Sequence, residues 1–129
     1  MEKVKNKIDI SVVRQKLSVL IKKRTGYIFS LVHGEPMVHG LPHDVFRKCG
    51  KGNCKCAGGI LHGPYPALSV NKDGKQRIVM IKKADAGVIL EQANRYRHYQ
   101  ETLAKIRRIN KEIDELLEQV KSATTRSYP

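Results

Sequence analysis

The 129-residue sequence carries 25 Lys and Arg against 12 Asp and Glu, a formal net charge of +13. This excess predicts an anionic partner, either nucleic acid or an acidic membrane surface. Aromatic residues make up only 5% of the chain and Trp is absent, which argues against a single large core.

Residues 1–26 predict a basic N-terminal segment that contains one short helix. Its apolar residues recur at helical spacing from Val13 to Ile21, and we expect Gly26 to end the helix. The charged N-terminus is not followed by the apolar stretch of a signal peptide, and no apolar run approaches the ~20 residues of a membrane span. We therefore expect a cytoplasmic protein.

Residues 27–83 predict a small β module. Two His-Gly pairs and two prolines in its first part exclude a long helix, so we expect short strands at 27–32 and 43–48. Strand-like runs at 65–71 and 76–82 flank the sequence Lys-Asp-Gly-Lys. Asp-Gly between two such runs is typical of a tight β-hairpin.

Residues 84–123 predict one long helix, in which Gly87 is the only Gly or Pro. At 1.5 Å per residue it spans roughly 55 Å, which is longer than a small core covers. Apolar residues alternate at three- and four-residue spacing, which is typical of a coiled coil. We expect this coiled coil to pair two copies of the chain in a homodimer. The residues assigned to its seam are Ile89, Tyr96, Tyr99, Leu103, Ile106, Asn110, Ile113, Leu117 and Val120.

Asn110 lies at a central position of that seam, where Asn favours an in-register dimer at a cost in stability. The alternative is that the same face packs on the N-terminal helix of its own chain, with Asn110 at the solvent edge. We expect the small, polar tail at 124–129 to be disordered.

All three cysteines lie within eight residues, and a histidine follows, with the spacing Cys-x4-Cys-x-Cys-x5-His. Clustered thiols without a signal peptide fit a reducing compartment better than a disulfide scaffold. Zinc takes four tetrahedral N and S ligands, and three Cys with one His form an ordinary structural set. The predicted zinc ligands are Cys49, Cys54, Cys56 and His62.

Other readings of the cluster stay open. His43 is a rival fourth ligand, and His33 and His39 are more remote ones. Reduced structural thiols without metal, or a redox pair of Cys54 and Cys56, are the alternatives to zinc.

Together with a zinc site, the predicted elements indicate an α+β fold. It consists of a short N-terminal helix, a zinc-stabilised β-hairpin or β-sheet module, and a long coiled-coil-like helix.

The stretch from Cys-Gly-Lys-Gly-Asn-Cys-Lys-Cys to His-Gly-Pro-Tyr resembles the core of a widespread family of small, basic, uncharacterised bacterial and archaeal proteins. Their genes resemble passengers of mobile elements, which implies a DNA-linked role, and the family lends no catalytic residues. Pro66 stands where that family usually has another aromatic residue. The resemblance spans roughly residues 40–115, and its matching positions are Cys49, Gly50, Lys51, Cys54, Cys56, His62, Gly63, Pro64, Tyr65, Leu68, Ser69, Gly74 and Lys75.

Residues 45–83 carry nine basic residues and one acidic residue, which favours nucleic-acid binding by this region. Lysines suit phosphates, Arg47 and Arg77 offer the bidentate fork that reads base edges, and Tyr65 is placed to stack on an unpaired base. The candidate contact residues are Arg47, Lys48, Lys51, Lys55, Tyr65, Lys72, Lys75, Arg77, Lys82 and Lys83.

The sequence therefore predicts a zinc-stabilised, dimeric accessory protein that binds nucleic acid, with DNA favoured over RNA. We expect no enzymatic activity, because the cysteine loop has no nearby Asp or Glu to serve as a general base. One alternative is a small subunit of a larger nucleoprotein machine that docks through the long helix. Another is a thiol- or metal-responsive switch.

Overall fold

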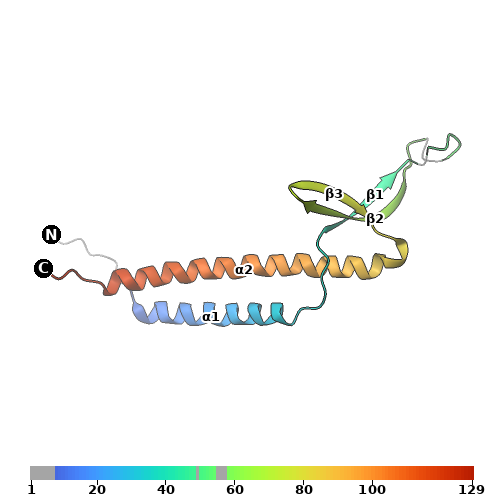
Figure 1. Ribbon diagram of the computed structural model, residues 1–129. Helices are drawn as coiled ribbons and strands as arrows, with labels where there is room; N and C mark the ends of the chain where they lie inside the picture. The colour runs from blue at the N-terminus through green and yellow to red at the C-terminus, as the bar shows by residue number, and fades with distance from the viewer. Residues whose placement is uncertain (1–7, 49, 55–57) are drawn as a thin grey trace. The chain divides into compact units, whose positions relative to one another are not determined.

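The computed structural model describes residues 8–48, 50–54 and 58–129. It has the predicted α+β fold: an N-terminal helix, a three-stranded antiparallel sheet and a long C-terminal helix (Figure 1). The elements are α1 (Ile10–Val32), β1 (Leu41–Arg47), β2 (His62–Lys72), β3 (Lys75–Met80), the 3-10 helix η2 (Lys83–Asp85) and α2 (Ala86–Thr124). Within the described residues, no helix has the length and apolar character of a membrane span.

The chain divides into two compact units. One joins α1 to the part of α2 that follows Gln100, and the other consists of residues 35–100. The long helix predicted at 84–123 is confirmed as α2, and residues 125–129 contain neither helix nor strand.

Helix α1 is longer than the sequence indicated. Asp9 caps it by accepting a hydrogen bond of 2.9 Å from the backbone N–H of Ser11. The helix then runs through Gly26 to Val32, so the predicted end at Gly26 and the predicted strand at 27–32 are wrong. A helical Gly costs only about 1 kcal/mol relative to Ala. Packing of the residues beyond it outweighs that cost.

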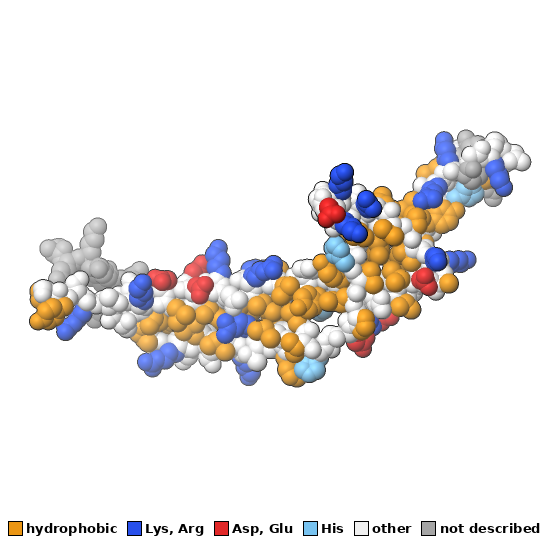
Figure 2. Space-filling view, in the orientation of Figure 1, with side chains coloured by type: hydrophobic (Ala, Val, Ile, Leu, Met, Phe, Trp, Pro, Cys, Tyr) orange, Lys and Arg blue, Asp and Glu red, His pale blue; other side chains and the backbone are white. Residues whose placement is uncertain are grey.

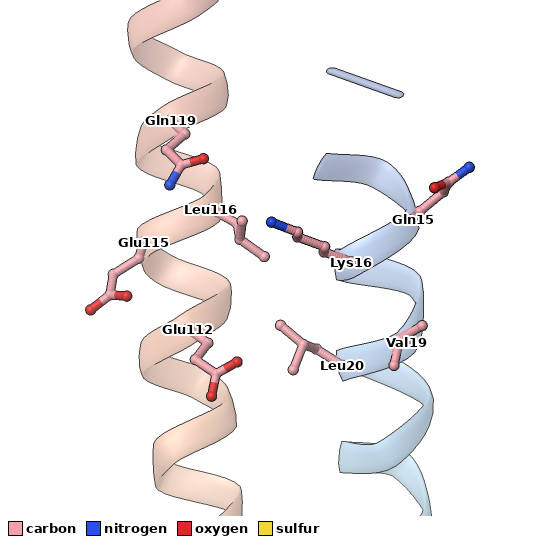
Figure 3. Close-up of a pocket in the computed structure, with 8 residues that line it drawn as sticks. All are labelled: Gln15, Lys16, Val19, Leu20, Glu112, Glu115, Leu116 and Gln119. Carbon is pink, nitrogen blue, oxygen red and sulfur yellow. The ribbon is translucent and has the colours of Figure 1, made fainter. Parts of the chain in front are cut away.

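That packing follows a heptad pattern on both helices of the first unit. The residues of α1 that are buried or half-buried at alternating spacings of three and four are Val13, Leu17, Leu20, Arg24, Tyr27 and Leu31. The corresponding residues of α2 are Thr102, Ile106, Ile109, Ile113, Leu116 and Val120. Leu20 and Leu116 point toward each other across the seam (Figure 3). The unit is therefore an antiparallel helical hairpin with a coiled-coil seam inside one chain.

Arg24 and Asn110 meet at the edge of this seam. Nη1 of Arg24 donates a hydrogen bond of 3.1 Å to Oδ1 of Asn110. Asn110 is exposed, as the intrachain alternative for this face required. Of the residues assigned to a dimer, Ile106 and Ile113 are buried within the chain, whereas Leu117 stays 51% exposed.

In the second unit, the sheet has the order β1-β2-β3 with both pairs antiparallel. Asp73 and Gly74 form the turn of the β2–β3 hairpin with φ angles of 54° and 76°. Such a pair of positive φ angles is what a two-residue turn between twisted strands requires, and it confirms the hairpin predicted from Asp-Gly.

The core of this unit is small. Its buried apolar side chains among the described residues are Ala67 and Leu68 of β2 and Ala93 of α2. The segment that enters the sheet is bound to α2: the backbone N–H of Val38 donates to the Gln92 carbonyl at 3.1 Å. Arg95 adds an ion pair of 2.6 Å to Glu35.

Candidate metal and nucleic-acid site

The cysteine loop leaves the sheet and returns to it at one end. Strand β1 ends at Arg47 and β2 begins at His62, and the strand register pairs these two residues. Within the loop, the N–H of Cys54 donates to the carbonyl of Lys51 at 3.2 Å, which closes a tight turn. This turn brings Sγ of Cys54 to 2.9 Å from Nε2 of His62.

Cys54 and His62 supply a thiol sulfur and an imidazole nitrogen, the two donor types that zinc prefers. Two such donors on one tetrahedral zinc lie about 3.5 Å apart, given metal–ligand lengths of about 2.3 and 2.0 Å. The observed 2.9 Å is a direct contact, so an ion between them has to separate the pair by about 0.6 Å. In donor type, the pair fits half of a zinc site.

The remaining predicted ligands, Cys49 and Cys56, lie outside the described residues. Among the residues that are described, no three metal-binding side chains come together. A four-ligand set at this loop therefore needs both of these cysteines in addition to the observed pair.

The sheet register supports His62 over His43 as the histidine of this site. His43 lies on β1 four residues before Arg47, which places it about 13 Å along the strand from the loop end. The other two candidate histidines have contacts elsewhere. The ring centroid of His33 lies 4.1 Å from that of Phe29, and the ring centroid of His39 lies 5.0 Å from that of Tyr96.

A hollow of about 380 Å³ opens beside His62. Two cationic side chains line it from the end of β1, and an aromatic ring and a thioether line it from β2 and β3. Tyr65 and Met80 share a face of the sheet, because Met80 pairs with Ala67, two residues from Tyr65. The lining residues are Arg47, Lys48, His62, Tyr65 and Met80, which we name the loop-end hollow.

A second basic group lies at the other end of the hairpin. Lys72 pairs with Lys75, and Arg77 pairs with Val70, so the three cationic side chains share one face. We name Lys72, Lys75 and Arg77 the turn group. Lys and Arg side chains gather at this turn, and others at the loop (Figure 2).

The structure thus divides the predicted contact residues into two groups. Arg47, Lys48 and Tyr65 lie at the loop end, where Lys82 and Lys83 also follow β3. The backbone N–H of Ile81 donates to the Pro66 carbonyl at 3.0 Å. This hydrogen bond holds the chain that follows β3 next to β2, near the loop end. Lys51 is an exposed loop residue, and Lys55 lies outside the described residues.

The distance between the two groups follows from the length of β2. Tyr65 and Lys72 are seven residues apart on that strand, so the groups are separated by about 23 Å. The sequence did not single out Met80, although the register of the Asp-Gly hairpin was a signal that it shares a face with Tyr65.

Together, the fold and site define a small α+β protein in which a three-stranded sheet presents basic side chains at both ends and a thiol–imidazole pair at one. The chain belongs to the family described as Domain of unknown function (DUF6788), whose model matches residues 10–89. The matched stretch includes α1, the whole sheet and the first residues of α2. No curated protein and no solved structure matches the chain.

Proposed function

We propose that this protein binds nucleic acid, DNA in preference to RNA, through the basic side chains of its sheet. A zinc ion held by Cys49, Cys54, Cys56 and His62 stiffens the loop beside them. The protein acts as an accessory component of a nucleoprotein complex that serves a mobile element. The observation that carries this proposal is the Cys54–His62 contact on the strand pair that also positions Arg47.

The charges of the sheet module support an electrostatic binding surface. Its described cationic residues are all exposed, and none forms an ion pair with another described residue: Arg47, Lys48, Lys51, Lys72, Lys75, Arg77, Lys82 and Lys83. A folded protein gains little from holding so many unpaired cations on a small sheet. The phosphates of a nucleic acid are suitable partners for these cations, because each contact releases condensed counterions and so favours binding.

Zinc supplies a crosslink between the loop and the sheet, with no chemistry of its own at the binding surface. His62 faces Arg47 across the β1–β2 pair, so fixing the His62 ring restricts the loop end of the sheet. Positioned cations lose less side-chain entropy on binding than cations on a mobile loop.

A dimer remains part of the proposal, now with a defined surface. Ile21 and Ile28 of α1 lie one turn on either side of Arg24, and Leu117 of α2 lies two turns beyond Asn110. These three residues are 45%, 44% and 51% exposed. Since Arg24 contacts Asn110, the three apolar residues beside this pair line one side of the helical hairpin. Two copies joined along that side form a four-helix bundle. Such a dimer presents two basic sheets and gains affinity by bivalent binding.

The test is fluorescence anisotropy with a labelled DNA of about 20 nucleotides, single-stranded or duplex, at low salt. Replacing the turn group together (Lys72→Gln, Lys75→Gln and Arg77→Gln) is expected to weaken binding at least tenfold. The matched control removes three exposed charges from α2, as Arg107→Gln, Arg108→Gln and Lys111→Gln, and is expected to have a smaller effect. Equal losses in the two variants contradict a binding surface on the sheet.

A further inference from the structure

The loop-end hollow has a composition that general phosphate binding does not require. We propose that it holds an unpaired nucleobase, so that the preferred ligand is single-stranded nucleic acid or a duplex with a displaced base. This inference rests on the proposed nucleic-acid binding and specifies the form of its ligand.

The first step is the exposure of Tyr65. It lies on β2, the central strand of the sheet, on which Ala67 is fully buried and Leu68 is 6% exposed. Tyr65 is nevertheless 40% exposed. A central strand normally covers its aromatic side chains, because an aromatic ring buries a large apolar area. The ring therefore presents apolar surface that a partner can cover.

The second step is what surrounds that ring. Met80 adds an apolar thioether on the same face, whereas Arg47 and Lys48 add two cations at the rim. Sulfur and aromatic groups suit a flat, polarizable base, and the cations suit the phosphate attached to it. An apolar surface beside two cations matches a nucleotide better than it matches a phosphate alone.

The third step is size and access. At about 380 Å³, the hollow is near the lower end of the range for small-molecule pockets. A base within a duplex shows only its edges in the grooves, because both of its faces are stacked on neighbouring pairs. The ring face of Tyr65 therefore becomes useful only for a base that has left the stack.

The turn group does not share this face. Tyr65 and Lys72 are seven residues apart on β2, an odd number, so their side chains lie on opposite faces of the sheet. The cations placed to contact the phosphates next to a bound base are therefore Arg47 and Lys48 at the hollow itself.

The experiment compares a labelled single strand with the same strand in a perfect duplex, using the full chain and anisotropy. We expect the single strand to bind at least about fivefold more tightly, and Tyr65→Ala to weaken it about tenfold while changing duplex affinity less than twofold. Tyr65→Phe keeps the ring and is expected to retain the preference. Tyr128→Ala removes a 92% exposed tyrosine outside the helices and strands and serves as the matched control.

A second measurement does not depend on how well the variants fold. The wild-type protein is given a strand of the same length whose bases are replaced by abasic spacers, which leaves the phosphates in place. We expect the abasic strand to bind about tenfold more weakly than the normal strand. Equal affinity for normal and abasic strands overturns the base-binding hollow but leaves steep salt dependence, and so the proposed function, intact. Failure to bind any of these nucleic acids overturns both.

Discussion

Nη1 of Arg24 on α1 donates a hydrogen bond of 3.1 Å to Oδ1 of Asn110 on α2. The contact joins positions 86 residues apart and lies at the edge of the apolar seam of the helical hairpin. Asn110, which the sequence placed at a central position of the predicted dimer seam, therefore has a partner in its own chain. Beside this pair, Ile21, Ile28 and Leu117 leave an apolar strip uncovered.

The substitution Asn110→Ile tests whether that strip pairs with a second copy. It removes the contact with Arg24 and makes the strip continuously apolar, so we expect tighter or higher-order association than in the wild type. Sedimentation equilibrium over a range of concentrations measures this directly. Asn110→Ala is the control, because it removes the same hydrogen bond while adding little apolar surface. A wild-type monomer whose mass is unchanged by Asn110→Ile is evidence that this face serves only intrachain packing.

The heptad pattern shows which features of the helices can be predicted from the sequence. It predicted the length of α2, and Ile106, Ile113 and Val120 belong both to the expected seam and to the observed one. Spacing alone does not identify the partner helix, because an intrachain hairpin and a dimer need the same periodicity. The prediction for α1 ends too early because Gly commonly ends helices, although Tyr27 and Leu31 continue the helical spacing beyond Gly26.

The substitution Cys54→Ser tests the zinc proposal. Serine replaces the thiolate with a much weaker zinc ligand, so we expect the bound metal to fall from one zinc per chain to well below one. Because metal-binding free energy contributes to folding, we also expect a lower melting temperature of the sheet. Metal analysis of the purified chain and thermal denaturation followed by circular dichroism give the two readouts.

His43→Ala is the matched control for that experiment. His43 lies about 13 Å along β1 from the loop end, so we expect this variant to keep its zinc. Loss of zinc from His43→Ala together with retention by His62→Ala would reverse the assignment of the fourth ligand. A melting profile of Cys54→Ser identical to that of the wild type counts against a structural metal.

The structure leaves no room for a side chain at Gly63 of the His-Gly-Pro-Tyr motif. Its φ is +139°, and a Cβ there would lie 2.8 Å from the Val45 carbonyl oxygen and 2.9 Å from Cδ1 of Phe46. We expect Gly63→Ala to lower the free energy of unfolding by about 1–3 kcal/mol, because backbone on β1 has to move. Chemical denaturation measures the change.

Gly87→Ala provides a control of opposite sign. Gly87 lies in the first turn of α2, where an added Cβ would meet open space, and Ala favours helix by up to about 1 kcal/mol. We expect this variant to be as stable as the wild type or more stable. If Gly63→Ala is equally neutral, the close approach of β1 and β2 at this motif does not constrain the fold.

The candidate site was predictable in its residue types but not in its arrangement. The Cys and His spacing identified Cys54 and His62 as partners, and Asp-Gly located the hairpin. The separation of the basic residues into two groups depends on strand register, which composition does not carry. The same register places His62 opposite Arg47 and leaves His43 in the interior of β1.

The central claim is that the basic sheet binds nucleic acid by contacting phosphates, and the slope of log K against log salt concentration tests it most directly. Each neutralised duplex phosphate contributes about −0.9 to that slope. We predict a wild-type slope steeper than about −3, and a slope shallower by about 2 to 3 when Lys72, Lys75 and Arg77 are all replaced by Gln. A slope near zero, or the same slope in both proteins, would contradict the account.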